Sequence, residues 1–244
     1  MAHNIEAQVV IASFNTWAFK REQPSDIELL RRVVGRRIAG GQPIEFVLYW
    51  GKGLRDDVAL PEIACLDFLA AMAARVKAVY APGATFRLVM TDTHARLNGH
   101  SRASMMAYFL AAGQAARERG FNWCLLDDLV RSRAGNIGTA CPAERPGGTI
   151  HQLERSAARW YKGRGRPIDG AIAYFDMNMI EKKAVEEEFP DSIFVTFNGS
   201  EFRVLFPDGM PIFYMYSLRK GISVKPWFVD EKQDLAVAAS RVCA

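Results

Sequence analysis

The stretch TFRLVMTDTHARLNGH, residues 85–100, joins a short apolar run to a dense polar cluster. The run over Thr85–Met90 predicts a buried β-strand, and the turn sequence Tyr80–Ala84 precedes it. Because ligands of open α/β sheets bind beyond the carboxyl ends of the strands, we expect the cluster to form part of a functional site. The cluster contains a carboxylate, two imidazoles, a guanidinium and an amide, on Asp92, His94, Arg96, Asn98 and His100.

Strands and helices are expected to alternate over the first half of the chain. Ile44–Trp50 is a nearly continuous apolar run and predicts a second buried strand. Ile5–Phe19 fits either a helix or a strand, and Asn122–Val130 predicts a short helix. This alternation is typical of an α/β fold. Amphipathic patterns predict helices over residues 26–38, 60–80 and 101–119.

The second half of the chain predicts further helices and a β-hairpin. Helices are expected over residues 151–160 and 175–189, and a strand follows over Ile193–Phe197. Phe202–Phe206 and Ile212–Tyr216 predict the hairpin, because the Pro-Asp-Gly sequence between them is typical of a turn.

No linker or change of composition divides the chain, so we expect a single α/β domain over residues 1–244. The order of elements predicts a mixed, mostly parallel sheet with helices on both faces, Rossmann-like, with the C-terminal hairpin at its end. Residues 131–148 are rich in glycine and proline and predict a mobile loop. Residues 231–244 predict a frayed tail.

The composition is that of an ordinary globular protein, with half of the residues apolar and a formal net charge of +4. This mildly basic charge suits an anionic small molecule. Nucleic acid binding would require a longer basic stripe than the cluster over Arg155–Arg166, so we expect no nucleic acid partner. No apolar run approaches the roughly 18 residues of a membrane span, so we expect no membrane partner.

The four cysteines form no CxxC pair, and the first residues contain no secretory signal pattern. We therefore expect a reducing, cytoplasmic setting. The cofactor stays unknown, because the sequence contains no motif that names one.

A second set of candidate site residues follows the strand Ile44–Trp50. Lys52 lies between two glycines, and glycine lets a backbone approach a ligand closely. Its amine is suited to forming a Schiff base or to binding phosphate. Arg55 is suited to bind an anion in the same loop. We expect Lys52 to be catalytic, and Trp50 and Arg55 to contact substrate.

The polar cluster allows more than one chemistry. Asp92 is suited to be a general base or to anchor a substrate ammonium, and it would equally serve as a helix cap. His94 and His100 are suited to move protons near neutral pH. We expect Asp92 and His94 to be catalytic, and Arg96, Asn98 and His100 to contact substrate. The alternative is a metal-dependent enzyme in which Asp92, His94 and His100 are the ligands, although their spacing is not a diagnostic metal motif.

Short motifs follow one another along the chain: Pro43–Phe46 followed by Lys52, Leu60–Glu62, Tyr80–Ala84 followed by Thr91–Asp92, Phe189–Ile193 and Lys225–Phe228. This ordered series resembles the isocyanide (isonitrile) synthase family, also known as the pyoverdine/dityrosine biosynthesis family. The resemblance implies a single-domain α/β enzyme that condenses the amino group of an aromatic amino acid with a pentulose phosphate, leaving one carbon as the isonitrile. It therefore implies specialised metabolism, with a small amino acid or amine as substrate and a sugar phosphate as co-substrate.

The chain departs from this family pattern at three polar positions. The family carries an arginine and then a histidine after its Phe-Pro-x-x-Ile segment, where this chain has Phe194 and Asn198. The family's Pro-Trp pair is followed by a histidine, and here by Phe228. These departures keep open a third alternative, a non-catalytic small-molecule-binding relative that has kept the pocket and lost the chemistry.

Overall fold

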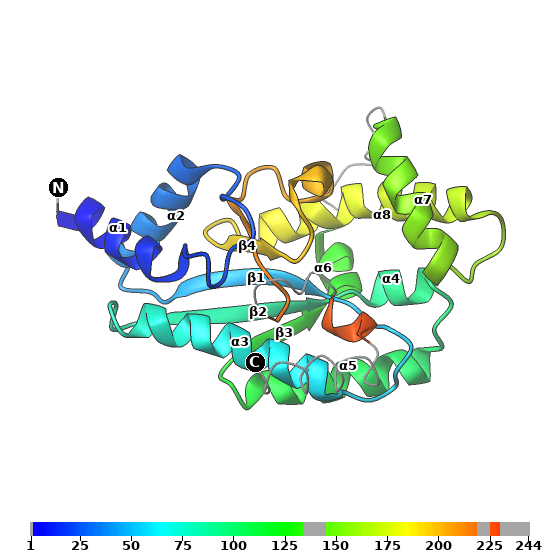
Figure 1. Cartoon of the computed structure of the whole chain (residues 1–244), viewed down its shortest axis with the longest axis horizontal. Coiled ribbons are helices and arrows are strands. Elements are labelled where there is room, and N and C mark those ends of the chain that lie inside the picture. The colour runs from blue at the N-terminus through cyan, green and yellow to red at the C-terminus, as the bar shows by residue number, and fades with distance from the viewer. Residues whose placement is uncertain (1, 134–144, 219–224, 230–244) are drawn as a thin grey trace, which may run out of the picture.

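A computed structural model of the chain describes residues 2–133, 145–218 and 225–229. Figure 1 shows a sheet with helices on both faces. The parallel strands are β1 (Ile44–Trp50), β2 (Ala84–Met90), β3 (Asn122–Leu125), β4 (Ile193–Thr196) and β5 (Ile212–Tyr214). The helices are α1 (Ala2–Phe14), α2 (Ile27–Ala39), α3 (Leu60–Lys77), α4 (Asp92–Leu97), α5 (Arg102–Arg117), α6 (Leu126–Arg133), α7 (Gly147–Trp160), α8 (Pro167–Glu188) and the short 3₁₀ helices η1 (Ser200–Leu205) and η2 (Pro226–Phe228).

The strands follow the order β3-β2-β1-β4-β5 across the sheet. The chain therefore builds outward from β1 in one direction and later returns to add β4 on the other side of β1. In the register, Trp50 lies opposite Met90 on one side of β1, and Leu48 lies opposite Val195 on the other. Ligands of doubly wound sheets bind outside the carboxyl ends of the strands at the point where the order reverses. In this sheet that point lies between β1 and β4.

The two faces of β1 belong to different hydrophobic cores. Phe46, Leu48 and Trp50 point to one face, where they pack with α1, α2, α3 and α5. Val47 is buried on the other face with α6, α7 and α8, and Tyr49 packs against this second core. Successive side chains of a strand point to opposite faces, so a strand covered on both sides needs an apolar run without alternation.

The predicted α/β fold is confirmed, but the mixed sheet and the C-terminal hairpin are wrong. Most of Phe202–Phe206 lies in η1, and β5 runs parallel to β4. Residues 202–205 of this segment form a 3₁₀ helix because α8 holds them in place. Lys182 Nζ donates to the backbone oxygen of Val204 and to the Asp208 carboxylate, at 2.9 Å each. The apolar residues that suggested a strand face α8 and join its core instead.

The prediction of a short helix over Asn122–Val130 is wrong for the first half of this range. β3 occupies residues 122–125 and pairs with β2, and α6 begins directly after it. A run of three apolar residues is too short for periodicity to distinguish a strand from a helix, so strand pairing decides. The ambiguous N-terminal segment is helical as far as Phe14.

The predicted loop over residues 131–148 is shorter at both ends, because α6 continues to Arg133 and α7 begins at Gly147. Residues 134–144 and the predicted tail over residues 231–244 lie outside the described part of the chain. Within the described part, every helix is too short or too polar to cross a membrane.

Candidate active site

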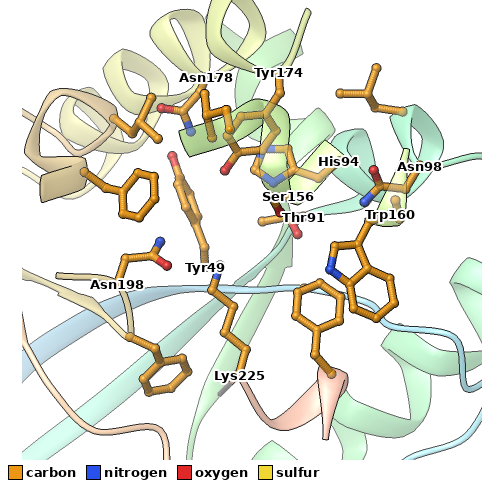
Figure 2. Close-up of a pocket in the computed structure, with 18 of the residues that line it drawn as sticks. Tyr49, Thr91, His94, Asn98, Ser156, Trp160, Tyr174, Asn178, Asn198 and Lys225 are labelled. Carbon is orange, nitrogen blue, oxygen red and sulfur yellow. The ribbon is translucent and has the colours of Figure 1, made fainter. Parts of the chain in front are cut away.

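A cavity of about 200 Å³ opens at the carboxyl edge of the sheet, where the strand order reverses between β1 and β4. β1 contributes Tyr49 to its lining, and the end of β4 contributes Thr196 and Asn198. α4, α7 and α8 supply further walls, and the segment 225–228 closes one side (Figure 2). The cavity therefore lies where the doubly wound topology predicts a ligand.

His94 and Glu181 form a hydrogen-bonded pair at this cavity. His94 lies in the first turn of α4, and its Nε2 donates to Glu181 Oε2 at 2.6 Å. The Glu181 side chain is only 1% exposed, and its other carboxylate oxygen has no hydrogen-bond partner among the described residues. A carboxylate that holds one imidazole nitrogen fixes the tautomer and stabilises the protonated ring.

One face of α8 supplies several polar groups at this site. Tyr174, Asn178 and Glu181 follow one another at intervals of four and three residues, which places them on the same side of a helix. Tyr174 packs edge-on against the His94 ring, with centroids 4.7 Å apart. In Figure 2, Tyr174 and Asn178 reach the cavity from above, and Tyr174 lies next to His94. This face of α8 therefore combines recognition groups with the support for the imidazole.

Two more buried polar atoms at the cavity lack partners among the described residues: the Tyr49 hydroxyl and Asn178 Oδ1. Burial raises the pKa of the Tyr49 hydroxyl well above its ordinary value, and the Glu181 carboxylate adds to the rise. The same two causes raise the pKa of Tyr174. Both phenols therefore stay protonated and able to donate. An unpaired buried polar atom costs about 1–3 kcal/mol, so a ligand that pairs with these atoms is favoured.

Lys225 brings an ammonium to the opposite side of the cavity, immediately before η2. Figure 2 shows its side chain reaching upward into the cavity, from below Tyr49. Burial lowers the pKa of the Lys225 amine to about 8, and no described residue offers it a carboxylate or hydrogen-bond partner. The sequence places this lysine in the Lys225–Phe228 motif, but it was not among the residues expected to be catalytic or to contact substrate.

Lys52, expected to be catalytic, lies at the cavity wall with its ammonium turned into its own loop. Its Nζ donates to the backbone oxygen of Arg55 at 2.6 Å and to the Asp56 carboxylate at 3.1 Å. The flanking glycines admit Trp227 rather than a ligand: a Cβ on Gly51 would lie 2.7 Å from the Trp227 ring, and one on Gly53 would lie 1.8 Å from its backbone oxygen.

Arg55 and Trp50, expected to contact substrate, both contact the segment 225–229 instead. The Arg55 guanidinium donates to the backbone oxygens of Pro226 and Val229 and pairs with the fully buried Glu62 carboxylate. The Trp50 ring is completely buried and packs against Trp227, with centroids 5.4 Å apart. Neither side chain lines the cavity.

Asp92 and Arg96, the first and third charged residues of the polar cluster, both interact with α6. Asp92 Oδ1 accepts from the backbone N–H of Asp127 at 3.0 Å, in the first turn of α6. Burial raises the pKa of the Asp92 carboxyl. Arg96 pairs with the Asp127 carboxylate at 2.8 Å and is largely exposed. Asp92 therefore binds a backbone N–H of α6 and does not cap the helix that directly follows it, and neither side chain lines the cavity.

Asn98 lines the cavity one helical turn after His94, whereas His100 does not. Burial lowers the pKa of His100, and the nearby Lys52 ammonium adds to the fall. The alternative metal site is not formed: within residues 2–133, 145–218 and 225–229, no three histidine, cysteine or acidic side chains are placed to hold one ion. His94 turns toward Glu181 and Asp92 toward α6, so their side chains diverge.

The three positions at which the chain departs from the family pattern all line this cavity: Phe194, Asn198 and Phe228. Phe228 stacks on Trp160, with centroids 4.3 Å apart and planes inclined by 14°. The places where the family has an arginine and two histidines thus hold two phenyl rings and an amide. This cavity is more apolar than the family pattern implies.

The structure has the fold of the PvcA protein of Pseudomonas aeruginosa. The match has a TM-score of 0.63 and 20% sequence identity, and it covers 91% of this chain and 87% of PvcA. PvcA is a pyoverdine-related protein of the isonitrile synthase family, so the structural resemblance predicted from the motifs is confirmed. No protein-family model matches the chain, and no curated protein matches it.

Proposed function

We propose that the chain is an isonitrile-synthase-like enzyme of specialised metabolism that acts on a small amino acid or amine, with a phosphorylated sugar as co-substrate. The observation that carries the proposal is the placement of the His94–Glu181 pair at the cavity where the strand order reverses, in a fold shared with PvcA. The two thiols that the structure describes, Cys65 and Cys124, are free, which supports the cytoplasmic setting that we propose.

The first step of such a condensation is attack by the substrate nitrogen on a carbonyl carbon. The nitrogen attacks only as a free amine, so a base must first remove a proton from the ammonium. His94 is suited to this task, because Glu181 holds its Nε2 and leaves Nδ1 as the nitrogen that accepts the proton. The Glu181 carboxylate then stabilises the imidazolium that results.

The carbonyl oxygen becomes a hydroxyl and leaves as water, so it needs a proton donor. Tyr49 is the group best suited to this, because its hydroxyl is buried at the cavity without a partner among the described residues and stays protonated. The aromatic walls exclude competing water from the reacting groups.

The test is direct detection of an isonitrile. The full chain is incubated with a pentulose 5-phosphate and each of a panel of amino acids and simple amines, and the products are analysed by mass spectrometry and by infrared absorption of the isonitrile group. We expect a product that requires both components and that is lost in His94→Gln. Absence of any isonitrile over the whole panel, with a folded protein, would contradict the proposal.

A second candidate is the non-catalytic binding relative, favoured by the replacement of family polar groups with Phe194, Asn198 and Phe228. Calorimetric titration of the same panel separates the two candidates. Saturable binding of an amino acid without turnover supports a binding protein, and turnover supports the enzyme.

A further inference from the structure

Lys225 is partly buried and differs from the fully buried lysines of the described chain. Lys52, Lys182 and Lys20 each donate to at least one oxygen, at distances between 2.6 and 3.0 Å. These partners offset the cost of burying an ammonium. Lys225 has no such partner among the described residues, and it is the one that enters the cavity. Its surroundings therefore disfavour the charged form of its amine.

The cavity offers Lys225 little that would make it an anion site. Phosphate and carboxylate sites usually combine several donors, such as an arginine fork or the backbone N–H groups of a helix N-terminus. Here the side chain adjoins aromatic walls that include Trp227 and Phe228, and the arginine of the family pattern is replaced by Phe194. Burial lowers the pKa of the amine to about 8, which leaves a substantial neutral fraction near pH 7.5. A neutral amine binds anions poorly and attacks carbonyl carbons well.

We propose that Lys225 is a catalytic residue that forms an imine with the carbonyl group of the co-substrate. The amine nitrogen attacks the carbonyl carbon to give a carbinolamine, which loses one water molecule and leaves a carbon–nitrogen double bond to Nζ. The substrate amine then attacks this imine carbon, and Nζ leaves as the free amine. Each step exchanges only protons and water, so no oxidant or reductant is required. The identity of the carbonyl compound rests on the proposed function, whereas the reactivity of Lys225 does not.

The lining residues already described suit these steps. Loss of water from the carbinolamine requires a proton donor, and Tyr49 keeps its phenolic proton at this cavity. Transfer to the substrate amine requires a base, and His94 lines the same cavity with Glu181 hydrogen-bonded to its Nε2. The proposal therefore assigns Lys225 to hold the carbonyl component and His94 to activate the amine component.

The test is reductive trapping on the full chain. The protein is incubated with D-ribulose 5-phosphate and sodium cyanoborohydride, and modified lysines are located by peptide mass spectrometry. A lysine with a pKa near 8 has about 200-fold more free amine at pH 7.5 than an exposed one. We therefore expect Lys225 to be labelled at least about tenfold faster than the exposed Lys162 and Lys183, with Lys52 unlabelled. Labelling of Lys225 at the rate of the exposed lysines would overturn the proposal.

Two variants separate imine formation from charge. Lys225→Arg keeps a cation but forms no imine, and Lys225→Met removes both properties. We expect both variants to lose trapping and isonitrile formation, whereas an anion-binding lysine would be rescued by arginine. Turnover retained by Lys225→Arg would therefore overturn the imine while leaving the proposed function intact. Trapping at Lys225 in a protein that forms no isonitrile would support the imine and contradict the proposed function.

Discussion

At the scale of single residues, the polar cluster predicted where the cavity lies better than it predicted which side chains line it. The cluster resembles a loop in the sequence, but α4 begins at Asp92. Residues two apart on a helix do not share a face, whereas residues four apart do. His94 and Asn98 therefore turn together toward the cavity, while Asp92 and Arg96 turn toward α6.

The polar side chains of α8 at the cavity were not predicted from the sequence, although a pattern in the sequence indicates them. Tyr174, Asn178 and Glu181 are polar groups at helical spacing on the inward side of α8, in a helix whose other inward residues are largely apolar. Such an interruption of an apolar face indicates a site or a polar network. Lys225 could not be selected in the same way, because its burial depends on how the segment 225–229 docks.

The His94–Glu181 pair gives a first prediction, for Glu181→Gln. The amide keeps the shape of the carboxylate but not the charge that stabilises an imidazolium, so we expect turnover to fall by roughly 10²-fold with little change in KM. Steady-state kinetics across pH measures this effect. Glu187→Gln is the matched control, since Glu187 is exposed on the same helix. An unchanged rate in Glu181→Gln would remove His94 from the role of base.

Lys225 gives a second prediction, on stability against pH. Its pKa falls from the ordinary value of 10.5 to about 8 on folding, so between these values the unfolded chain binds more protons. The free-energy penalty is therefore fully present below pH 8 and disappears as the pH rises through 10.5. Lys225→Met should stabilise the protein at pH 7 by up to about 3 kcal/mol, and the gain should shrink toward pH 10.

Urea unfolding of the parent and of Lys225→Met at pH 7 and at pH 10 checks this prediction. Lys183→Met, at an exposed lysine of α8, serves as the control and should give the same small difference at both values. A stability gain from Lys225→Met that does not change with pH would mean that lost charge is not its cause.

At the scale of elements, the loop 51–55 and the segment 225–229 form one unit. The sequence predicted the loop as a ligand site because glycines flank a lysine. The structure uses those glycines for close packing against Trp227, and it uses Arg55 to hold the backbone of the segment. A sequence pattern does not reveal whether the backbone that approaches a glycine belongs to a ligand or to a distant part of the same chain.

A third prediction concerns Arg55→Leu. This change leaves the Glu62 carboxylate buried without its cation and frees the segment that carries Lys225. We expect the free energy of unfolding to fall by about 3 kcal/mol, as measured by urea denaturation. The double variant Arg55→Leu/Glu62→Leu should recover much of this loss and still show weak trapping at Lys225. Full trapping in the double variant would show that Arg55 does not position the segment.

At the scale of the whole molecule, the buried strands and their alternation with helices were predictable, because each strand is covered on both faces and needs a continuous apolar run. The order of the strands was not predictable, since β4 could have been added at either edge or inserted beside β1 without any change in local pattern. The position of the cavity follows from that order. The sequence therefore predicted the layers of the fold, and long-range pairing determines the site.

A fourth prediction concerns the free energy of unfolding of the whole protein when a ligand binds. A ligand that fills the cavity binds only the folded chain and contacts elements from both halves of the sequence. At a free concentration of 100 times its Kd it should stabilise the protein by about 2.7 kcal/mol. Trp160 and Trp227 line the cavity, so their fluorescence should change over the same concentration range. A fluorescence change without a rise in the unfolding midpoint would indicate binding elsewhere.

The segment 225–229 also sets an order of events during synthesis. The five strands that the structure describes all precede it in the chain, so that sheet and most of the cavity wall are already made when it emerges from the ribosome. Synthesis adds only about 5–20 residues per second, so the earlier elements have time to collapse before the last ones are made. The nascent protein would thus form its sheet before the segment 225–229 docks. Docking of this segment would then complete the cavity wall and bring the Lys225 amine into the site.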